Sequence, residues 1–243
     1  MRVLSWNLYH GRAVPPAHRP LLDEFATLLN GLEWDVAFLQ EAPPRWFVEL
    51  QRRTGSTGAR VLTSRNSFGW LRGRLADWKP DLMKSQEGGS NQLLVRSGDG
   101  IADHHAALLT RWPERRKLQW ARLDSGVCVA NLHASAGRPR NAAAEVLNAA
   151  ELAVGWSGSL PLVFGGDLNL RPAQQPELFQ RLRADFGLYD PTDPKAIDHL
   201  LVRGLEVVAP PRRLPAEERE LPGAGGGPIR LSDHAPVVAE FLR

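Results

Sequence analysis

Only one cysteine, Cys128, occurs among the 243 residues, and this scarcity excludes one class of protein. A single cysteine forms no disulfide within its own chain, so a small secreted scaffold held together by disulfides is excluded. Cys128 stands in an apolar stretch from Val127 to Ala130, which predicts a buried position on a strand.

Long apolar runs are also missing. No window contains 18 consecutive apolar residues, so the sequence predicts no membrane-spanning helix. The first residues follow a strand pattern and lack the charged start and apolar stretch of a secretory signal. We therefore expect a cytoplasmic protein without a transmembrane segment, with a monomer as the simplest oligomeric state.

The overall composition is that of a soluble globular protein. Hydrophobic residues make up 43% and charged residues 23% of the chain, which argues against disordered, collagen-like and coiled-coil proteins. A chain of this length buries roughly 70 to 75% of its surface on folding, so it needs no metal for stability, and a metal site would serve function. Because no linker and no repeat interrupts it, we expect one domain over residues 1–243.

Positive charge is unevenly distributed, although the net charge is only +3. Residues 43–80 contain eight basic side chains against two acidic ones; the basic residues are Arg45, Arg52, Arg53, Arg60, Arg65, Arg72, Arg74 and Lys79. A second basic group consists of Arg111, Arg115, Arg116, Lys117 and Arg122. Such patches suit a polyanion, with Trp46, Trp70 and Trp78 available for stacking. The alternatives are an ordinary solvated surface and tryptophans packed in the core.

Hydrophobic periodicity predicts a chain that alternates strands and helices at both ends and has antiparallel strands in the middle. Strands are predicted at residues 3–8, 35–40, 92–96, 105–109, 117–123, 127–132, 160–164, 197–202, 205–208 and 236–241. Helices are predicted at 20–32, 43–53 and 141–154, and residues 54–90 are expected to be irregular. Gly165 and Gly166 are expected to end the strand before them.

Polar residues follow or flank predicted strands at five points, which is where open α/β architectures place their sites. They are Asn7, Gln40–Glu41, Asn131–His133, Gly165–Asn169 and Ser232–His234, with Asp198–His199 upstream of the last. A carboxylate such as Glu41 suits a hard cation like Mg²⁺. Asp167 and Asn169 are two positions apart, so in an extended segment both would face one point. The glycines before them would let a substrate approach the backbone.

Taken alone, each of these residues also has an ordinary structural interpretation. Asn7 is typical of a turn, and Glu41 of a helix entry. Asp167 and Asn169 after a glycine pair are typical of a turn as well, and a lone histidine is more often a packed or surface side chain. The functional interpretation therefore depends on all of them occurring together.

Six short motifs together resemble those of the endonuclease/exonuclease/phosphatase superfamily. They are Trp6-Asn7, Leu39-Gln40-Glu41, Asn131-Leu132-His133, Gly166-Asp167-Leu168-Asn169, Ile197-Asp198 and Ser232-Asp233-His234. This superfamily includes pancreatic deoxyribonuclease, abasic-site endonucleases, sphingomyelinases and inositol polyphosphate phosphatases. The motifs span nearly the whole chain, but they do not separate these substrate classes.

The resemblance implies an α+β fold, a four-layer αββα sandwich in which two mostly antiparallel sheets pack face to face with helices outside. It also implies a site at one edge of the sheets. There Glu41 would be the principal ligand of Mg²⁺ or Mn²⁺, with Asn7 beside it and Asp233 completing the shell.

Five further residues receive roles from the same resemblance. Asp167 would orient or deprotonate the attacking water, and Asn169 would hold a phosphate oxygen. His234, paired with Asp198, would contact the scissile phosphate, and His133 would be the second polar group against it. These residue types suit phosphodiester hydrolysis, which needs a cation, a positioned water and donors to the non-bridging oxygens.

Two departures from the superfamily pattern bear on the substrate. Some deoxyribonucleases pair the histidine at the position of His133 with a carboxylate from a preceding strand, whereas Gly88–Asn91 contains no acid. Some abasic-site endonucleases have an acid where this chain has Tyr9, and an aromatic-lined pocket where it has Lys195–Ile197. Both departures argue against those two specificities.

Three functions are compatible with these motifs. The basic patches favour a Mg²⁺-dependent nuclease acting on DNA or RNA. The alternative is a phosphatase or phosphodiesterase for a phospholipid head group, an inositol phosphate or another small phosphoester, with Ser67–Leu71 as a weak candidate for lipid contact. A non-catalytic binding module is disfavoured because Glu41, Asp167 and His234 are all present.

Overall fold

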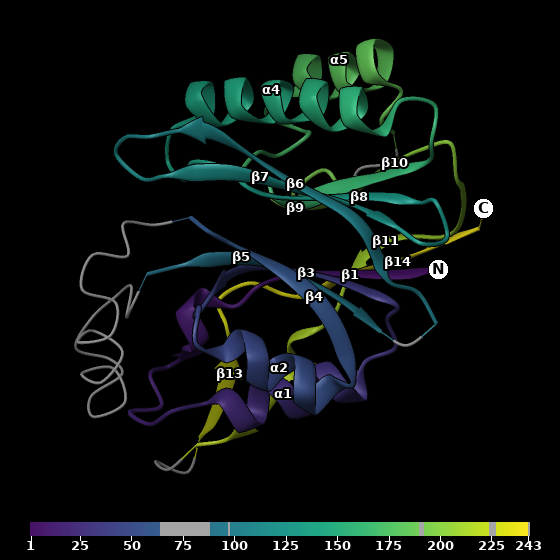
Figure 1. The fold of residues 1–243 in the computed structure, drawn as a ribbon. Coiled ribbons are helices and arrows are strands. Elements are labelled where there is room, and N and C mark those ends of the chain that lie inside the picture. The colour runs from purple at the N-terminus through teal and green to yellow at the C-terminus, as the bar shows by residue number, and fades with distance from the viewer. Residues whose placement is uncertain (64–87, 97, 190–191, 224–226, 243) are drawn as a thin grey trace.

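The structure is a computed structural model that describes residues 1–63, 88–96, 98–189, 192–223 and 227–242. Two β-sheets pack face to face, with helices on both outer faces (Figure 1). Helices α1 (Leu22–Gly31) and α2 (Trp46–Thr54) cover one sheet, and α4 (Pro139–Ser157) and α5 (Pro176–Phe186) cover the other. This is the four-layer αββα sandwich that the sequence resemblance implies.

The two large sheets contain six and five strands. The first consists of β1 (Arg2–Asn7), β3 (Val36–Ala42), β4 (Ser56–Leu62), β5 (Ser90–Arg96), β11 (Glu206–Arg213) and β14 (Val237–Leu242), in the order β11-β14-β1-β3-β5-β4. The second consists of β6 (Ile101–Thr110), β7 (Arg116–Leu123), β8 (Cys128–His133), β9 (Leu162–Asp167) and β10 (Asp198–Arg203), in the order β10-β9-β8-β7-β6. Neighbouring strands are antiparallel except for the pairs β1–β3 and β8–β9.

A small third sheet lies beside the first. It pairs β2 (Ala13–Val14) with β13 (Pro228–Leu231) and β13 with β12 (Glu220–Pro222). Two short 3-10 helices, η1 (Tyr9–Gly11) and η2 (Ala216–Arg219), complete the regular elements of the described residues. Because η1 follows β1 directly, it turns the chain at the carboxyl end of that strand.

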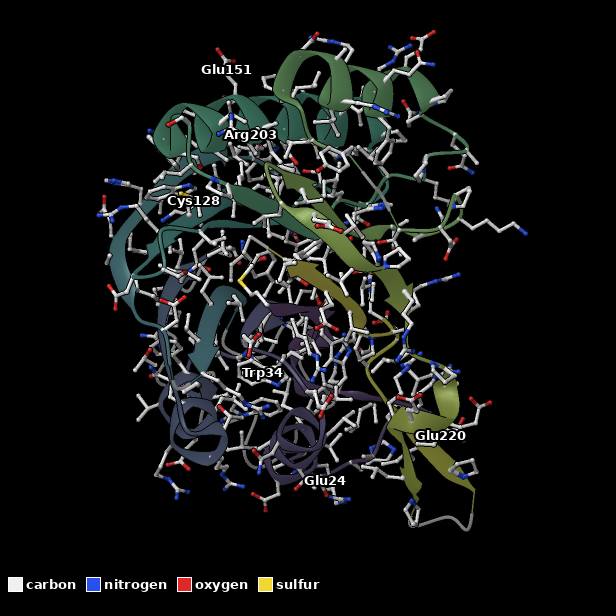
Figure 2. All side chains as sticks on the ribbon, turned by 90° about the vertical axis from the view of Figure 1, so that its right-hand side faces the viewer. Glu24, Trp34, Cys128, Glu151, Arg203 and Glu220 are labelled. Carbon is white, nitrogen blue, oxygen red and sulfur yellow. The ribbon has the colours of Figure 1, made fainter. Side chains whose placement is uncertain are left out.

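Three hydrophobic clusters hold the four layers together. One lies between the second sheet and helices α4 and α5, one between the first sheet and α1 and α2, and the third between the two sheets. Cys128 belongs to the first of these clusters and Trp34 to the second, and Figure 2 shows them in separate layers of the sandwich. The predicted buried position of Cys128 on a strand is confirmed.

The predicted strands and all three predicted helices are present, but β4, α5, the three short strands of the small sheet and the two 3-10 helices were not predicted. Strand β4 lies in the stretch expected to be irregular, and only Val61 among its residues is buried, so no alternation marked it. Helix α5 had signals that were overlooked, namely Pro176 at its start, Gly187 in a left-handed conformation after its end, and Leu178 and Leu182 buried four residues apart. The stretch Ser67–Leu71 lies outside the described residues.

Gly165 and Gly166 do not end a strand, because both lie inside β9. A Cβ on Gly165 would lie 2.1 Å from the carbonyl oxygen of His199, and a Cβ on Gly166 would lie 2.0 Å from that of Leu132. Gly166 also has a φ of +120°, which side chains rarely adopt. The two glycines therefore admit the backbones of β10 and β8 rather than a substrate, which corrects the expectation from the sequence.

A buried hydrogen bond ties the two sheets together beneath their common edge. Gln40 on β3 donates through Nε2 to Oδ1 of Asn131 on β8, at 2.8 Å. Asn131 in turn donates to the carbonyl oxygens of Leu39 at 3.3 Å and Gln92 at 3.2 Å. Since both amides are fully buried, these bonds fix how the two sheets are placed against each other.

None of the helices among the described residues is long and apolar enough to span a membrane. This agrees with the absence of long apolar runs in the sequence.

We expect Asn131→Ala to destabilise the protein by roughly 2 to 3 kcal/mol, because it leaves the buried amide of Gln40 without this partner. Chemical denaturation of the variant measures the change. Asn148→Ala on the exposed face of α4 is the matched control and should change the free energy of unfolding by less than about 0.5 kcal/mol. Equal stabilities of the two variants would contradict the role of the cross-sheet bond.

Candidate active site

Strand ends from both sheets converge at one edge of the sandwich. Asn7 ends β1 and Glu41 lies near the end of β3 in the first sheet, whereas His133 and Asp167 end β8 and β9 in the second. β1 begins beside the N-terminus marked in Figure 1 and runs away from it, so the site lies at the end of the sandwich far from that label. The structure thus brings together residues that are far apart in sequence, such as Asn7 and Asp167, which are 160 positions apart.

The carboxylate of Asp167 is the centre of the site and is 1% exposed. Its Oδ2 accepts a hydrogen bond of 2.9 Å from Nδ2 of Asn7, and its Oδ1 accepts one of 3.1 Å from the backbone N–H of Asn169. The same Oδ2 lies 3.5 Å from Nε2 of His133 and 3.8 Å from Nε2 of His234. One carboxylate therefore contacts four of the residues that the motifs indicate.

Burial raises the pKa of Asp167 to about 7, and the nearby charge of Asp198 acts in the same direction. The charge of His234 and the hydrogen bond from Asn7 oppose this shift. A carboxylate with a pKa near neutrality can both hold and release a proton under ordinary conditions, as proton transfer requires.

His234 and Asp198 form a hydrogen-bonded pair. Nδ1 of His234 lies 2.9 and 3.1 Å from the two carboxylate oxygens of Asp198. Burial lowers the pKa of His234, but the hydrogen bond and charge of Asp198 outweigh burial and, with the charge of Asp167, raise that pKa to about 10. His234 is therefore an imidazolium cation, and its Nε2 lies 3.8 Å from Oδ2 of Asp167.

His133 is held in the opposite state, because its partner is a cation. Nη1 of the buried Arg116 lies 3.0 Å from Nδ1 of His133. A guanidinium only donates, so Nδ1 accepts and the ring proton resides on Nε2. Burial, together with the charges of Arg116, His234 and His10, holds the pKa of His133 well below its usual value. His133 is a neutral donor whose Nε2–H faces Asp167 and, at 3.9 Å, Oε1 of Glu41.

Arg116 replaces the carboxylate that some deoxyribonucleases place against this histidine, and the sequence did not assign it this role. It stands 17 residues before His133 and reaches it because β7 and β8 are antiparallel neighbours. Its other terminal nitrogen donates to Glu114 at 2.6 Å. Arg116 was counted among surface cations, and its burial corrects that expectation.

Glu41 stands at an irregularity in β3 with a left-handed φ of +47°. This conformation turns its side chain toward the site, where Oε2 lies 3.3 Å from Nε2 of His10. Burial raises the pKa of Glu41, while the charges of His234 and Arg116 lower it. His10, on η1, was not identified from the sequence, since nothing local connects it to a residue 31 positions later.

The remaining motif residues occupy supporting or peripheral positions. Asn169 has a φ of +53° and donates through Nδ2 to the carbonyl of Ala134 at 3.0 Å, so a turn rather than strand alternation places it beside Asp167. Ser232 donates to the carbonyl of Asn7 at 2.7 Å and accepts the backbone N–H of His234 at 3.0 Å, which fixes the turn that carries the histidine. Asp233 is exposed and forms no hydrogen bond or ion pair with the described residues.

The donor set fits a hard divalent cation. Glu41 and Asn7 supply carboxylate and amide oxygens, and among the described residues neither Glu41 nor Asp167 has an arginine or lysine ion pair that would offset its buried charge. Asp167, Asp198 and His234 also bring ligand atoms within 4.8 Å of one another. Since Nδ1 of His234 is engaged with Asp198, the Glu41 and Asn7 side of the site is the better cation position.

The predicted basic patch at residues 43–80 is only partly within the described residues. Arg52 forms an ion pair with Glu49, and Arg53 with Asp23, so these cations are locally neutralised. Trp46 packs against Phe25 and is 4% exposed, so for this tryptophan the alternative of core packing is confirmed. Arg65, Arg72, Arg74, Lys79, Trp70 and Trp78 lie outside the described residues.

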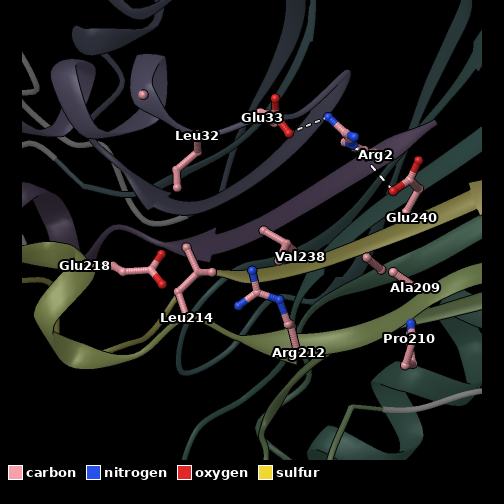
Figure 3. Close-up of a pocket in the computed structure, with 12 residues that line it drawn as sticks. Arg2, Leu32, Glu33, Ala209, Pro210, Arg212, Leu214, Glu218, Val238 and Glu240 are labelled. Carbon is pink, nitrogen blue, oxygen red and sulfur yellow. Dashed lines mark hydrogen bonds and ion pairs between the residues drawn. The ribbon is translucent and has the colours of Figure 1, made fainter.

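A cavity of about 360 Å³ lies at the other end of the sandwich and is separate from this site (Figure 3). Arg2, at the start of β1, lines this cavity. Its Nη1 lies 2.5 Å from Oε2 of Glu33, and its Nε lies 3.5 Å from Oε2 of Glu240. Arg2 begins β1 and Asn7 ends it, so the part of the cavity at Arg2 lies at the opposite end of that strand from the candidate site.

Comparison with known families gives one match, to the endonuclease/exonuclease/phosphatase family, over residues 4–234. No curated protein matches the sequence.

Solved structures share the fold at low sequence identity. A mannosyl-6-phosphatase of Bacteroides thetaiotaomicron superimposes with a TM-score of 0.75 at 16% identity, covering 100% of both chains. The catalytic domain of human Nocturnin with a bound sulfate anion gives a TM-score of 0.68 at 18% identity, covering 99% of this chain and 94% of that one. TDP2 from Caenorhabditis elegans gives 0.65 at 16% identity, covering 100% and 74%.

We expect Arg116→Met to release His133 from its single tautomer, because the donor to Nδ1 is lost while the length of the side chain is kept. Long-range ¹H–¹⁵N correlation spectra of the histidine rings measure this. The buried His199, whose Nε2 lies 2.8 Å from the carbonyl of Leu170, is the internal control and should keep its spectrum. A wild-type His133 protonated at Nδ1 would contradict the assignment.

Proposed function

Because the chain belongs to the endonuclease/exonuclease/phosphatase family, we propose that this phosphoesterase is a Mg²⁺-dependent nuclease that hydrolyses phosphodiester bonds of DNA or RNA. The observation that carries the proposal is the arrangement around Asp167. A buried carboxylate lies between a neutral donor, His133, and a cationic one, His234, with Asn7 and the backbone of Asn169 fixing its orientation.

This arrangement assigns a chemical role to each group. Asp167 accepts a proton from a water molecule, whose oxygen forms a bond to phosphorus as the bond from phosphorus to the leaving oxygen breaks. The leaving alkoxide takes up a proton from solvent and departs as an alcohol. His234 and His133 donate to the non-bridging oxygens, and Asn169 holds another phosphate oxygen. Asp198 keeps His234 charged and oriented.

Glu41 and Asn7 would hold the Mg²⁺ ion, with Mn²⁺ as a substitute, and Asp233 would complete the shell. The cation supplies neutralisation of the negative charge that develops on the phosphoryl oxygens. His10 braces the carboxylate of Glu41 from the opposite side, at 3.3 Å.

Basic side chains near the site favour a nucleic acid as the substrate. Besides the buried Arg116 and its partner Glu114, the segment 111–117 contains Arg111, Arg115 and Lys117, next to the end of β8. The likeness to a mannosyl-6-phosphatase over the full length of both chains favours a second candidate, a phosphatase for a small phosphoester.

Asp167→Asn should lower Mg²⁺-dependent cleavage by about 100-fold or more, because an amide accepts no proton from water. The assay uses single- and double-stranded DNA, RNA, bis(p-nitrophenyl) phosphate, inositol phosphates and mannose 6-phosphate, with wild type and variant side by side. Asp185→Asn on the exposed part of α5 is the matched control and should retain wild-type turnover. Hydrolysis of the small monoesters alone would replace the nuclease by the phosphatase.

Glu41→Gln should weaken Mg²⁺ binding by about 10- to 100-fold, because it removes the charged oxygen ligand. Isothermal titration calorimetry with MgCl₂ measures the affinity, and a chelator should abolish wild-type turnover until Mg²⁺ is restored. Glu151→Gln, on the exposed side of α4, is the control and should bind Mg²⁺ like the wild type. Unchanged Mg²⁺ affinity in Glu41→Gln would remove Glu41 from the metal site.

A further inference from the structure

The connection between β6 and β7 forms a second concave surface beside the candidate active site. Leu108, Arg111, Arg115 and Lys117 line a cavity of about 440 Å³ there. Three of these four side chains are cations, and no acid of the described ranges lines the cavity. The surface is therefore both hollowed and strongly positive.

The three cations are available to a ligand. Arg111, Arg115 and Lys117 form no ion pair within the part of the chain that the structure describes, and the adjacent Glu114 is bound to Arg116 at 2.6 Å. Other surface arginines, such as Arg52 and Arg53, are neutralised by neighbouring carboxylates. An unpaired cluster around a hollow is suited to an anionic group, because guanidinium groups bind phosphate in a bidentate manner.

Strand register places this cavity on the same edge as the site. Leu118 pairs with Leu132 and Gln119 with Asn131, so β7 begins beside His133, where β8 ends. β6 ends at Thr110, opposite Arg116, on that same edge. Since neighbouring strands are about 4.8 Å apart, the cations lie roughly one to two strand spacings, about 5 to 10 Å, to the side of β8.

An exposed aromatic ring accompanies the cations. Trp112 stands between Arg111 and Arg115 in the connection and is 68% exposed. A tryptophan in a basic setting offers a stacking face for a nucleobase, which an inositol phosphate or a phospholipid head group does not need. The cations alone would bind a nucleic acid and a small phosphoester equally well, whereas Trp112 favours the nucleic acid.

We propose that Arg111, Arg115, Lys117 and Trp112 form a subsite for a nucleotide that flanks the cleaved bond in a single-stranded nucleic acid. The cations bind its phosphate, and Trp112 stacks on its base. This inference rests on the proposed nuclease function, which it makes more specific: the substrate extends from the scissile phosphate at His133 and His234 toward β6.

Binding is measured without cleavage, by fluorescence anisotropy of a labelled single-stranded oligonucleotide in the presence of a chelator. The variant Arg111→Gln/Arg115→Gln/Lys117→Gln should bind at least about tenfold more weakly. The magnitude of its slope of log affinity against log salt should also fall by about 2, because each lost phosphate contact reduces that magnitude by roughly 0.7. Trp112→Ala should also bind about tenfold more weakly, and Trp112→Phe should recover most of this loss.

The matched control removes the same number of charges elsewhere. Arg181→Gln/Arg183→Gln/Arg212→Gln alters the outer helix α5 and the strand β11 beside the other cavity and should bind like the wild type. Thermal midpoints of all variants identify any that fail to fold, and for these the single variant Arg115→Gln replaces the triple one.

The outcomes separate the subsite from the nuclease. Equal affinities and salt slopes in the two triple variants would overturn the subsite even if the wild type cleaves nucleic acid. If the charge and tryptophan variants weaken binding but the wild type cleaves no phosphodiester, the subsite stands and the proposed reaction fails. Two results together would overturn a nucleic acid as the ligand of the subsite. Inositol hexakisphosphate at equal concentration would displace the oligonucleotide, and Trp112→Ala would bind the oligonucleotide as tightly as the wild type.

Discussion

The hydrogen bond between Asn7 and Asp167 joins the two sheets at the one place where chemistry requires them to meet. Asn7 ends a strand of the first sheet and Asp167 ends a strand of the second, and their side chains are 2.9 Å apart. The bond forms only if the sheets are correctly placed, and the buried bond of Gln40 to Asn131 beneath it secures that placement. The same buried hydrogen bonds thus fix how the sheets pack and where the side chains of the candidate site lie.

Two histidines beside the same carboxylate have opposite protonation states, and their outer partners decide which is which. Asp198 accepts a hydrogen bond from Nδ1 of His234 and stabilises its cationic form. Arg116 donates a hydrogen bond to Nδ1 of His133 and thereby disfavours the cationic form of that histidine. A phosphate at this site would meet one charged and one neutral donor. The arrangement avoids two adjacent imidazolium charges, whose repulsion would have to be overcome during folding.

The small net charge of +3 conceals an asymmetry between the two ends of the sandwich. At the end with the site, the connection from β6 to β7 presents unpaired cations around a hollow. At the other end, the cavity beside Arg2 has a mixed lining, in which Glu33, Glu218 and Glu240 stand with Arg2 and Arg212. The proposed nuclease would use these cations to attract its substrate, and this attraction would weaken as salt rises.

Hydrophobic periodicity is a local signal, and from it the sequence by itself determined the main strands and three helices. The sandwich and the candidate site residues followed from the resemblance of six short motifs to a known family. It missed β4, whose mostly exposed residues show no alternation, and misread the two glycines in β9, whose purpose depends on neighbouring strands. Only the tertiary structure brought Arg116 to His133 and His10 to Glu41. Strand register and a turn at the end of β1 set these two pairings, and no local pattern in the sequence around either partner predicts them.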